Sequence, residues 1–112
     1  MSGFEVFPRG RRGHPPHDVP VLSVERGRRG RLNNAAVAAL NSPIRVELLF
    51  DAEATTIGVR ACDDSNPNGY RLTDGRVFSL ADFFRHYGLP RISGQLPGHL
   101  KGDILGFPMD AP

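Results

Sequence analysis

Glycine and proline interrupt this sequence at short intervals, and this feature most limits what it can fold into. The 112 residues contain 13 glycines and 10 prolines but no tryptophan. Glycine weakens helices and strands, and proline lacks the amide hydrogen that both need. With 39% hydrophobic residues, the sequence predicts one domain with a small core and many turns.

We find neither a run of about 18 apolar residues nor a charged-then-apolar start. We therefore expect a cytoplasmic protein that does not enter a membrane. The one cysteine, Cys62, cannot form an internal disulfide and gives no indication of an oxidising compartment.

Positive charge is concentrated in the N-terminal third. Residues 1–31 contain seven arginines against three acidic residues, whereas residues 32–112 contain seven basic and nine acidic residues. Residues 1–20 combine Pro, Gly and Arg without periodicity, which predicts a flexible basic arm before a single domain at 21–112. Such an arm suits a phosphate-rich partner, but it can also simply aid solubility.

The sequence of the first half of the domain predicts short strands on either side of a helix. Asn33 or Asn34 can cap this helix, and Pro43 ends it. Gly58 is a candidate bulge in the strand that contains it. The expected elements are a strand at 19–25, a glycine–arginine loop at 26–31, a helix at 34–41, and a hairpin of strands at 44–50 and 56–62.

The second half, after a turn cluster at 63–69, predicts an amphipathic helix and a second hairpin. Ser79 and Asp82 have the spacing of a capping box, and Gly88 with Pro90 supplies the helix stop. The apolar face expected on this helix comprises Leu80, Phe83, Phe84 and Tyr87, at i, i+3, i+4 and i+7. Residues 91–109 predict a glycine-rich hairpin.

The two halves, 21–62 and 68–108, share this order of elements. At an offset of 45, Gly30 aligns with Gly75 and Arg31 with Arg76. This pattern predicts an internal duplication. The alternative is that any small β-rich domain has turns and helices at such intervals.

Residues 21–62, a strand, a Gly-Arg loop, a short helix and a "VELLFD…TIGVR" hairpin, resemble the swapped-hairpin regulators of the SpoVT/AbrB/MazE family. The sequence departs from that pattern at Asn33, where a proline is often found, and at 41–43, where a glycine stop is usual. The resemblance implies an interlaced barrel of two such units. The units come either from one duplicated chain with pseudo-two-fold symmetry, as in relatives of the MraZ type, or from a homodimer.

The arginines are the best candidates for a binding site. Guanidinium groups offer planar, multi-donor contacts to phosphate and guanine edges, and Gly27 and Gly30 allow close backbone approach. The resemblance implies double-stranded DNA as partner of the loop, and the arm is expected to reach an adjacent groove. The alternatives are a solvated loop and an acidic protein surface. The candidate nucleic-acid-binding residues are Arg9, Arg11, Arg12, Arg26, Arg28, Arg29 and Arg31.

Asp74 interrupts the same pattern in the second half, because its charge would repel phosphate. If DNA binds, one side of the barrel should therefore make most of the contact. A dimer would restore the two-fold axis that palindromic sites require.

Neither a metal site nor an active site is expected. His14 and His17 have the spacing of metal ligands but lie on the arm. The negative charge of the two aspartates after Cys62 should disfavour its thiolate form. Ser79 is better explained as a helix cap than as a nucleophile, and no phosphate-binding glycine motif is present. We therefore expect neither an enzyme nor a cofactor.

The aromatic helix face offers a rival function. Phe83, Phe84 and Tyr87 are expected mainly in the core, but as a surface patch they would dock another protein. The sequence thus predicts a mainly β fold with two short helices, of the swapped-hairpin barrel type. Its favoured function is a DNA-binding transcriptional regulator, and the alternative is a non-catalytic adaptor or inhibitor that docks on a larger complex.

Overall fold

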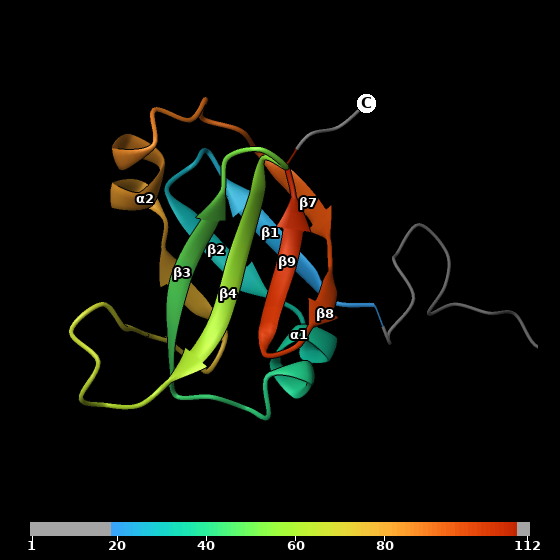
Figure 1. Cartoon of the computed structure of the whole chain (residues 1–112), viewed down its shortest axis with the longest axis vertical. Helices are drawn as coiled ribbons and strands as arrows, with labels where there is room; N and C mark the ends of the chain where they lie inside the picture. The colour runs from blue at the N-terminus through green and yellow to red at the C-terminus, as the bar shows by residue number, and fades with distance from the viewer. Residues whose placement is uncertain (1–18, 110–112) are drawn as a thin grey trace, which may run out of the picture.

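The computed structural model describes residues 19–109, which form two antiparallel sheets and two short helices. Sheet A has the strand order β6-β2-β1-β7, and sheet B has the order β5-β3-β4-β9-β8. In Figure 1, β3, β4 and β9 of sheet B cross in front of β1 and β2 of sheet A. The elements are β1 (Val21–Glu25), β2 (Arg29–Leu32), α1 (Asn34–Ala39), β3 (Arg45–Asp51), β4 (Thr56–Cys62), β5 (Tyr70–Arg71), β6 (Val77–Ser79), α2 (Ala81–His86), β7 (Gly94–Pro97), β8 (His99–Lys101) and β9 (Ile104–Pro108).

The prediction of a mainly β fold with two short helices is confirmed. Apolar side chains from both sheets and from α2 form one cluster, because alternate strand residues point to the same face. The largest fully buried side chains are Leu22, Leu32, Val46, Ile57, Val59, Leu80, Leu105 and Phe107. Within residues 19–109, no helix has both the length and the apolar character needed to cross a membrane.

Asn33 starts α1 and also ties it to β1. Its side-chain oxygen accepts hydrogen bonds from the backbone N–H of Ala36 at 2.9 Å and of Val21 at 3.0 Å. Its side-chain amide donates to the carbonyl of Val19 at 2.9 Å. The predicted cap at Asn33 is therefore confirmed, and it positions the helix against the first strand.

The start of α2 differs from the prediction. Leu80 is the residue before the helix, and no side chain caps it. Ser79 instead ends β6, where it pairs with Arg29 of β2, so its hydroxyl does not form the expected capping box. The predicted stop is confirmed by Gly88, which adopts a φ of 62° just after the helix.

Three other expectations are corrected by strand pairing. The 26–31 segment is not a loop throughout, because β2 begins at Arg29 and pairs with both β1 and β6. Gly58 is not a bulge, since the β3–β4 register runs through it without interruption. The segment before the last turn divides at Gly98, so that β7 joins sheet A while β8 pairs with β9 in sheet B.

Candidate nucleic-acid interface

The arginine hairpin, which we define as residues 21–32, is formed by β1, β2 and a tight turn at Arg26–Arg28. Arg26 and Gly27 both have positive φ, 51° and 62°, and the N–H of Arg28 donates to the carbonyl of Glu25 at 2.9 Å. Positive φ at both central residues is the mark of a type I′ turn, whose twist matches that of paired strands. Glycine is required at Gly27 also by space, because a Cβ there would lie 2.9 Å from Cδ2 of Phe84.

The turn is fixed to the second half of the chain by its backbone. The N–H of Gly27 donates to the carbonyl of Ile92, and the N–H of Arg26 donates to the hydroxyl of Ser93, both at 2.9 Å. The carbonyl of Arg28 accepts from the N–H of Leu80 at 2.8 Å. The arginine side chains therefore extend from a backbone that is held in place on both sides of the turn.

All four predicted arginines of this hairpin are exposed. Arg29 and Arg31 alternate with the buried Gly30 and Leu32, so their side chains lie on the same solvent-facing side of sheet A. Arg26 and Arg28 lie at the turn that ends the hairpin.

Within residues 19–109, neither ion pair involves any of these arginines, and none of their guanidinium groups donates a hydrogen bond. Their charge is therefore available to a partner.

A shallow groove of about 450 Å³ crosses the outer face of sheet A. Arg29 and Arg31 line it, whereas the turn arginines do not. Glu25 lies directly opposite Arg29 in the β1–β2 register and is the acidic residue of this groove. The other side chains that line it include Ser23, Val77, Ser93 and Gln95. The groove is thus basic and polar, with one carboxylate that opposes anion binding.

Two more arginines lie beside this hairpin that the site prediction did not include. A Cβ on Gly27 would lie 3.2 Å from Cα of Arg91, which places the exposed Arg91 next to the turn. The carbonyl of Arg76 accepts from the N–H of Leu32, and its guanidinium donates to the side chain of Asn34 at 3.2 Å. Arg91 gave no sequence signal, because contact between distant segments is not readable from local pattern. The predicted arm residues Arg9, Arg11 and Arg12 lie outside the described residues.

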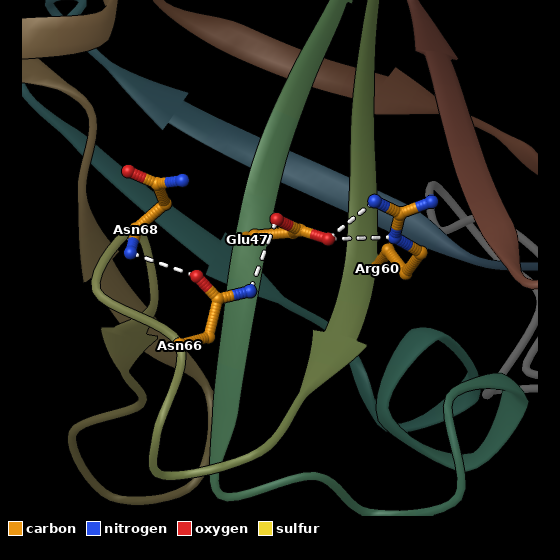
Figure 2. Close-up of polar contacts among 4 residues, drawn as sticks. All are labelled: Glu47, Arg60, Asn66 and Asn68. Atoms are coloured by element: carbon orange, nitrogen blue, oxygen red, sulfur yellow. Dashed lines mark hydrogen bonds and ion pairs between the residues drawn. The ribbon is translucent and has the colours of Figure 1, made fainter.

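A polar network on sheet B holds the 63–69 turn cluster against the strands (Figure 2). Glu47 of β3 accepts hydrogen bonds from Arg60 of β4 and from the side chain of Asn66 at 3.2 Å. Asn66 in turn accepts from the N–H of Asn68 at 2.8 Å. Hydrogen bonds from Arg60 and then from Asn66 hold the pKa of Glu47 below its usual value. Such a carboxylate stays ionised and paired, which suits a structural role and not that of a general base.

The remaining chemical candidates do not gather into a site in the described part of the chain. Burial raises the pKa of the Cys62 thiol, and Glu47 and the two following aspartates raise it further, so thiolate formation is disfavoured. Between Val19 and Met109, no group of three or more His, Cys, Asp or Glu residues has a metal-binding arrangement. His14 and His17 lie outside these residues.

The predicted protein-interaction patch is mostly core. Phe83 and Phe84 are 6% and 3% exposed, because α2 turns them toward the cluster between the sheets. Tyr87 alone of the three is exposed, at 45%, and its ring centroid lies 4.7 Å from that of Phe50. Of the three predicted residues, only the Tyr87 ring, which packs against Phe50, is left on the surface.

We compared the chain with protein-family models, with curated proteins and with solved structures, and none of them matches it.

Proposed function

We propose that this protein is a DNA-binding regulator of the swapped-hairpin type that contacts duplex DNA through the arginine hairpin. The observation that carries the proposal is the set of four exposed guanidinium groups on the arginine hairpin, none of which forms an ion pair or hydrogen bond within residues 19–109. Three hydrogen bonds made by the backbone of the turn hold the hairpin in place. Guanidinium forks match phosphate geometry and form charge-assisted, often bidentate hydrogen bonds. Such contacts supply most of the affinity of proteins for DNA.

The arrangement of the arginines suits a phosphate backbone. β1 and β2 are the two central strands of the four-stranded sheet A, and Arg29 and Arg31 extend from its solvent-facing side. Arg26 and Arg28 lie at the turn that ends the hairpin, so all four guanidinium groups would contact phosphates of the duplex. A regulator of this bacterial type would act in the cytoplasm.

The order of elements supports the swapped-hairpin type. A strand, the glycine–arginine segment, the helix α1 and a hairpin of β3 and β4 follow one another, which is the order on which the family resemblance rests. Strands of the first half pair with strands of the second in both sheets. This exchange is what an interlaced barrel requires.

The test is a fluorescence-anisotropy titration of the full chain against a labelled mixed-sequence duplex of about 20 base pairs, at salt concentrations from about 50 to 200 mM. The R29A/R31A double variant should reduce the slope of log K against log salt by about 2, since two phosphate contacts are lost. The matched control is R71A/K101A, which removes two exposed cations from sheet B. The control should leave the slope near that of the unaltered chain.

Two results would overturn the proposal. One is no measurable binding at about 50 mM salt, where phosphate contacts are strong. The other is an equal loss of binding in both double variants, which would indicate general charge attraction. In the first case, an acidic protein surface becomes the better candidate for the partner of the arginines.

A further inference from the structure

We infer that the chain is two copies of one hairpin–helix–hairpin unit at an offset of 48 residues, and that Asp74 excludes the second copy from binding anions. The second part rests on the proposed function. The first unit is residues 21–62 and the second is 69–109. A single chain would then present a pseudo-two-fold face to DNA, with only one side of that face basic.

The turns of the two units have the same backbone geometry. In the second turn, Asp74 and Gly75 have φ values of 55° and 75°, matching Arg26 and Gly27. The N–H of Arg76 donates to the carbonyl of Thr73 at 3.1 Å, which corresponds to the bond that closes the first turn. The pairs Thr73–Val77 and Glu25–Arg29 flank the two turns in the same way. The tight turn is therefore one structure built twice.

The hydrogen bonds between the units are reciprocal. Leu80 donates its N–H to the carbonyl of Arg28 at 2.8 Å, and Leu32 donates to the carbonyl of Arg76 at 2.9 Å. Both donors and both acceptors differ by the same 48 positions. Adding 48 to the residue numbers of the first unit and subtracting 48 from those of the second turns one bond into the other. A two-fold axis between the units produces such a pair of bonds.

The strand registers show where that axis crosses each sheet. Gly30 pairs with Phe78 in sheet A, and Gly58 pairs with Gly106 in sheet B. Each residue thus faces its own counterpart at an offset of 48, as happens only where a two-fold axis crosses an antiparallel pair. One offset satisfies both sheets.

The remaining strands pair in the same order, with a register shift of two residues. The pairing of β1 with β7 corresponds to the pairing of β5 with β3, and β3–β4 corresponds to β8–β9, so that β3 corresponds to the whole β7–β8 segment. This segment follows an offset of 50, because Leu22 pairs with Leu96 whereas Tyr70 pairs with Val46. Core positions also correspond, each pair being at most 5% exposed: Val24 and Leu72, Leu32 and Leu80, Ile57 and Leu105, and Val59 and Phe107. The alignment at an offset of 45, which pairs Gly30 with Gly75, agrees with neither the turns nor the registers.

The two units differ in charge where they would meet a polyanion. The four arginine positions of the first unit correspond, in order, to Asp74, Arg76, Val77 and Ser79 in the second. Only Arg76 keeps its charge, and Asp74 reverses the charge of Arg26. With about 3.3 Å per strand residue, the two turns lie about 10 Å from the axis along antiparallel strands, on opposite sides. The second turn is therefore placed to reach DNA, and its charge opposes contact.

The test replaces Asp74 in the full chain by arginine and measures the same salt-dependent anisotropy. The turn accepts arginine, since Arg26 occupies the equivalent left-handed position in the first unit. D74R should tighten binding at about 100 mM salt by about tenfold and raise the salt slope by about 1, as expected for one new phosphate contact. The matched control is D103R, an equal charge change on the exposed β8–β9 turn of sheet B.

A rescue experiment makes the test specific for the equivalence of the turns. R26A should lose about one unit of slope, R26A/D74R should regain it, and R26A/D103R should not. Equal effects of D74R and D103R would overturn this inference while leaving the proposed function intact, provided the R29A/R31A variant still weakens binding. Failure of the unaltered chain to bind DNA would overturn both. Circular dichroism and thermal melting verify that each variant is folded.

Discussion

At the scale of single residues, the carboxylate of Glu25 within the basic groove would oppose the phosphate binding that we propose there. Glu25 faces Arg29 across the β1–β2 pair without forming an ion pair with it in the described structure. Its negative charge lowers the potential at the point where a phosphate would contact Arg29. We therefore expect Arg31, which faces the uncharged Ser23, to contribute more to binding than Arg29.

Replacing this carboxylate should strengthen DNA binding. E25Q keeps the shape of the side chain and removes its repulsion of phosphate, so affinity at about 50 mM salt should rise about threefold. The measurement is fluorescence anisotropy with the duplex described above. E53Q removes an exposed carboxylate from the β3–β4 turn and should change affinity less. If both variants give the same gain, the charge of Glu25 has no local effect.

Residue-scale signals were readable where the chemistry is local. Asn33 as a helix cap and Gly88 as a helix stop follow from conformations that these residues favour by themselves. The exposure of the arginines also agrees with their charge. The spacing of Ser79 to Asp82 fits a capping box, but pairing with Arg29 keeps Ser79 in a strand. The pairing of β6 with β2 thus decides the conformation of Ser79, against the preference of its local sequence.

At the scale of elements, Gly98 lets one segment serve both sheets. It separates β7, which pairs with β1, from β8, which pairs with β9. A Cβ at this position would lie 2.4 Å from the carbonyl oxygen of Gly106 and 2.5 Å from Cδ1 of Phe107. The chain can therefore pass from one sheet to the other only if this residue has no side chain.

A methyl group at Gly98 should destabilise the fold. We expect G98A to lower the free energy of unfolding by about 2 kcal/mol, because both neighbours are fixed by the sheet and the core. Urea denaturation followed by circular dichroism measures this change. G106A is the matched control, since a Cβ there would make only ordinary contacts, the nearest at 3.4 Å. A loss in G98A no greater than that in G106A would contradict this account of the crossing.

The elements themselves were predictable to different degrees. The 44–50 and 56–62 strands have strong apolar patterns, and the structure places β3 and β4 there within one residue. The strand β2 was predicted as a loop, because alternating glycine and arginine carry little β-propensity. It is a strand because β1 and β6 pair with it on both sides. No local pattern contains that information.

At the scale of the whole molecule, the duplication that we infer predicts a monomer. Both units of the proposed barrel come from the same chain, and strand exchange takes place within it. Sedimentation of the full chain should therefore give a mass near 12.3 kDa. A stable species of twice that mass would contradict a self-contained barrel and indicate that a second copy supplies part of the assembly.

The duplication that we propose is only partly predictable from the sequence. The shared order of elements predicted it, whereas the offset did not follow from residue matches. At an offset of 48 the identical positions include Gly27 with Gly75, Arg28 with Arg76 and Gly58 with Gly106, too few to stand out in one sequence. The registers identify the offset because a symmetry axis constrains both sheets at once.

The reciprocal bonds between Leu32, Arg76, Leu80 and Arg28 also bear on how the molecule comes apart. Each unit completes the backbone ladder of the other, so cutting the chain in the 63–69 segment would leave two fragments with open ladders. Neither fragment alone could complete these strand pairings. We therefore expect unfolding to be a single cooperative event, in which both halves of the chain lose their structure together.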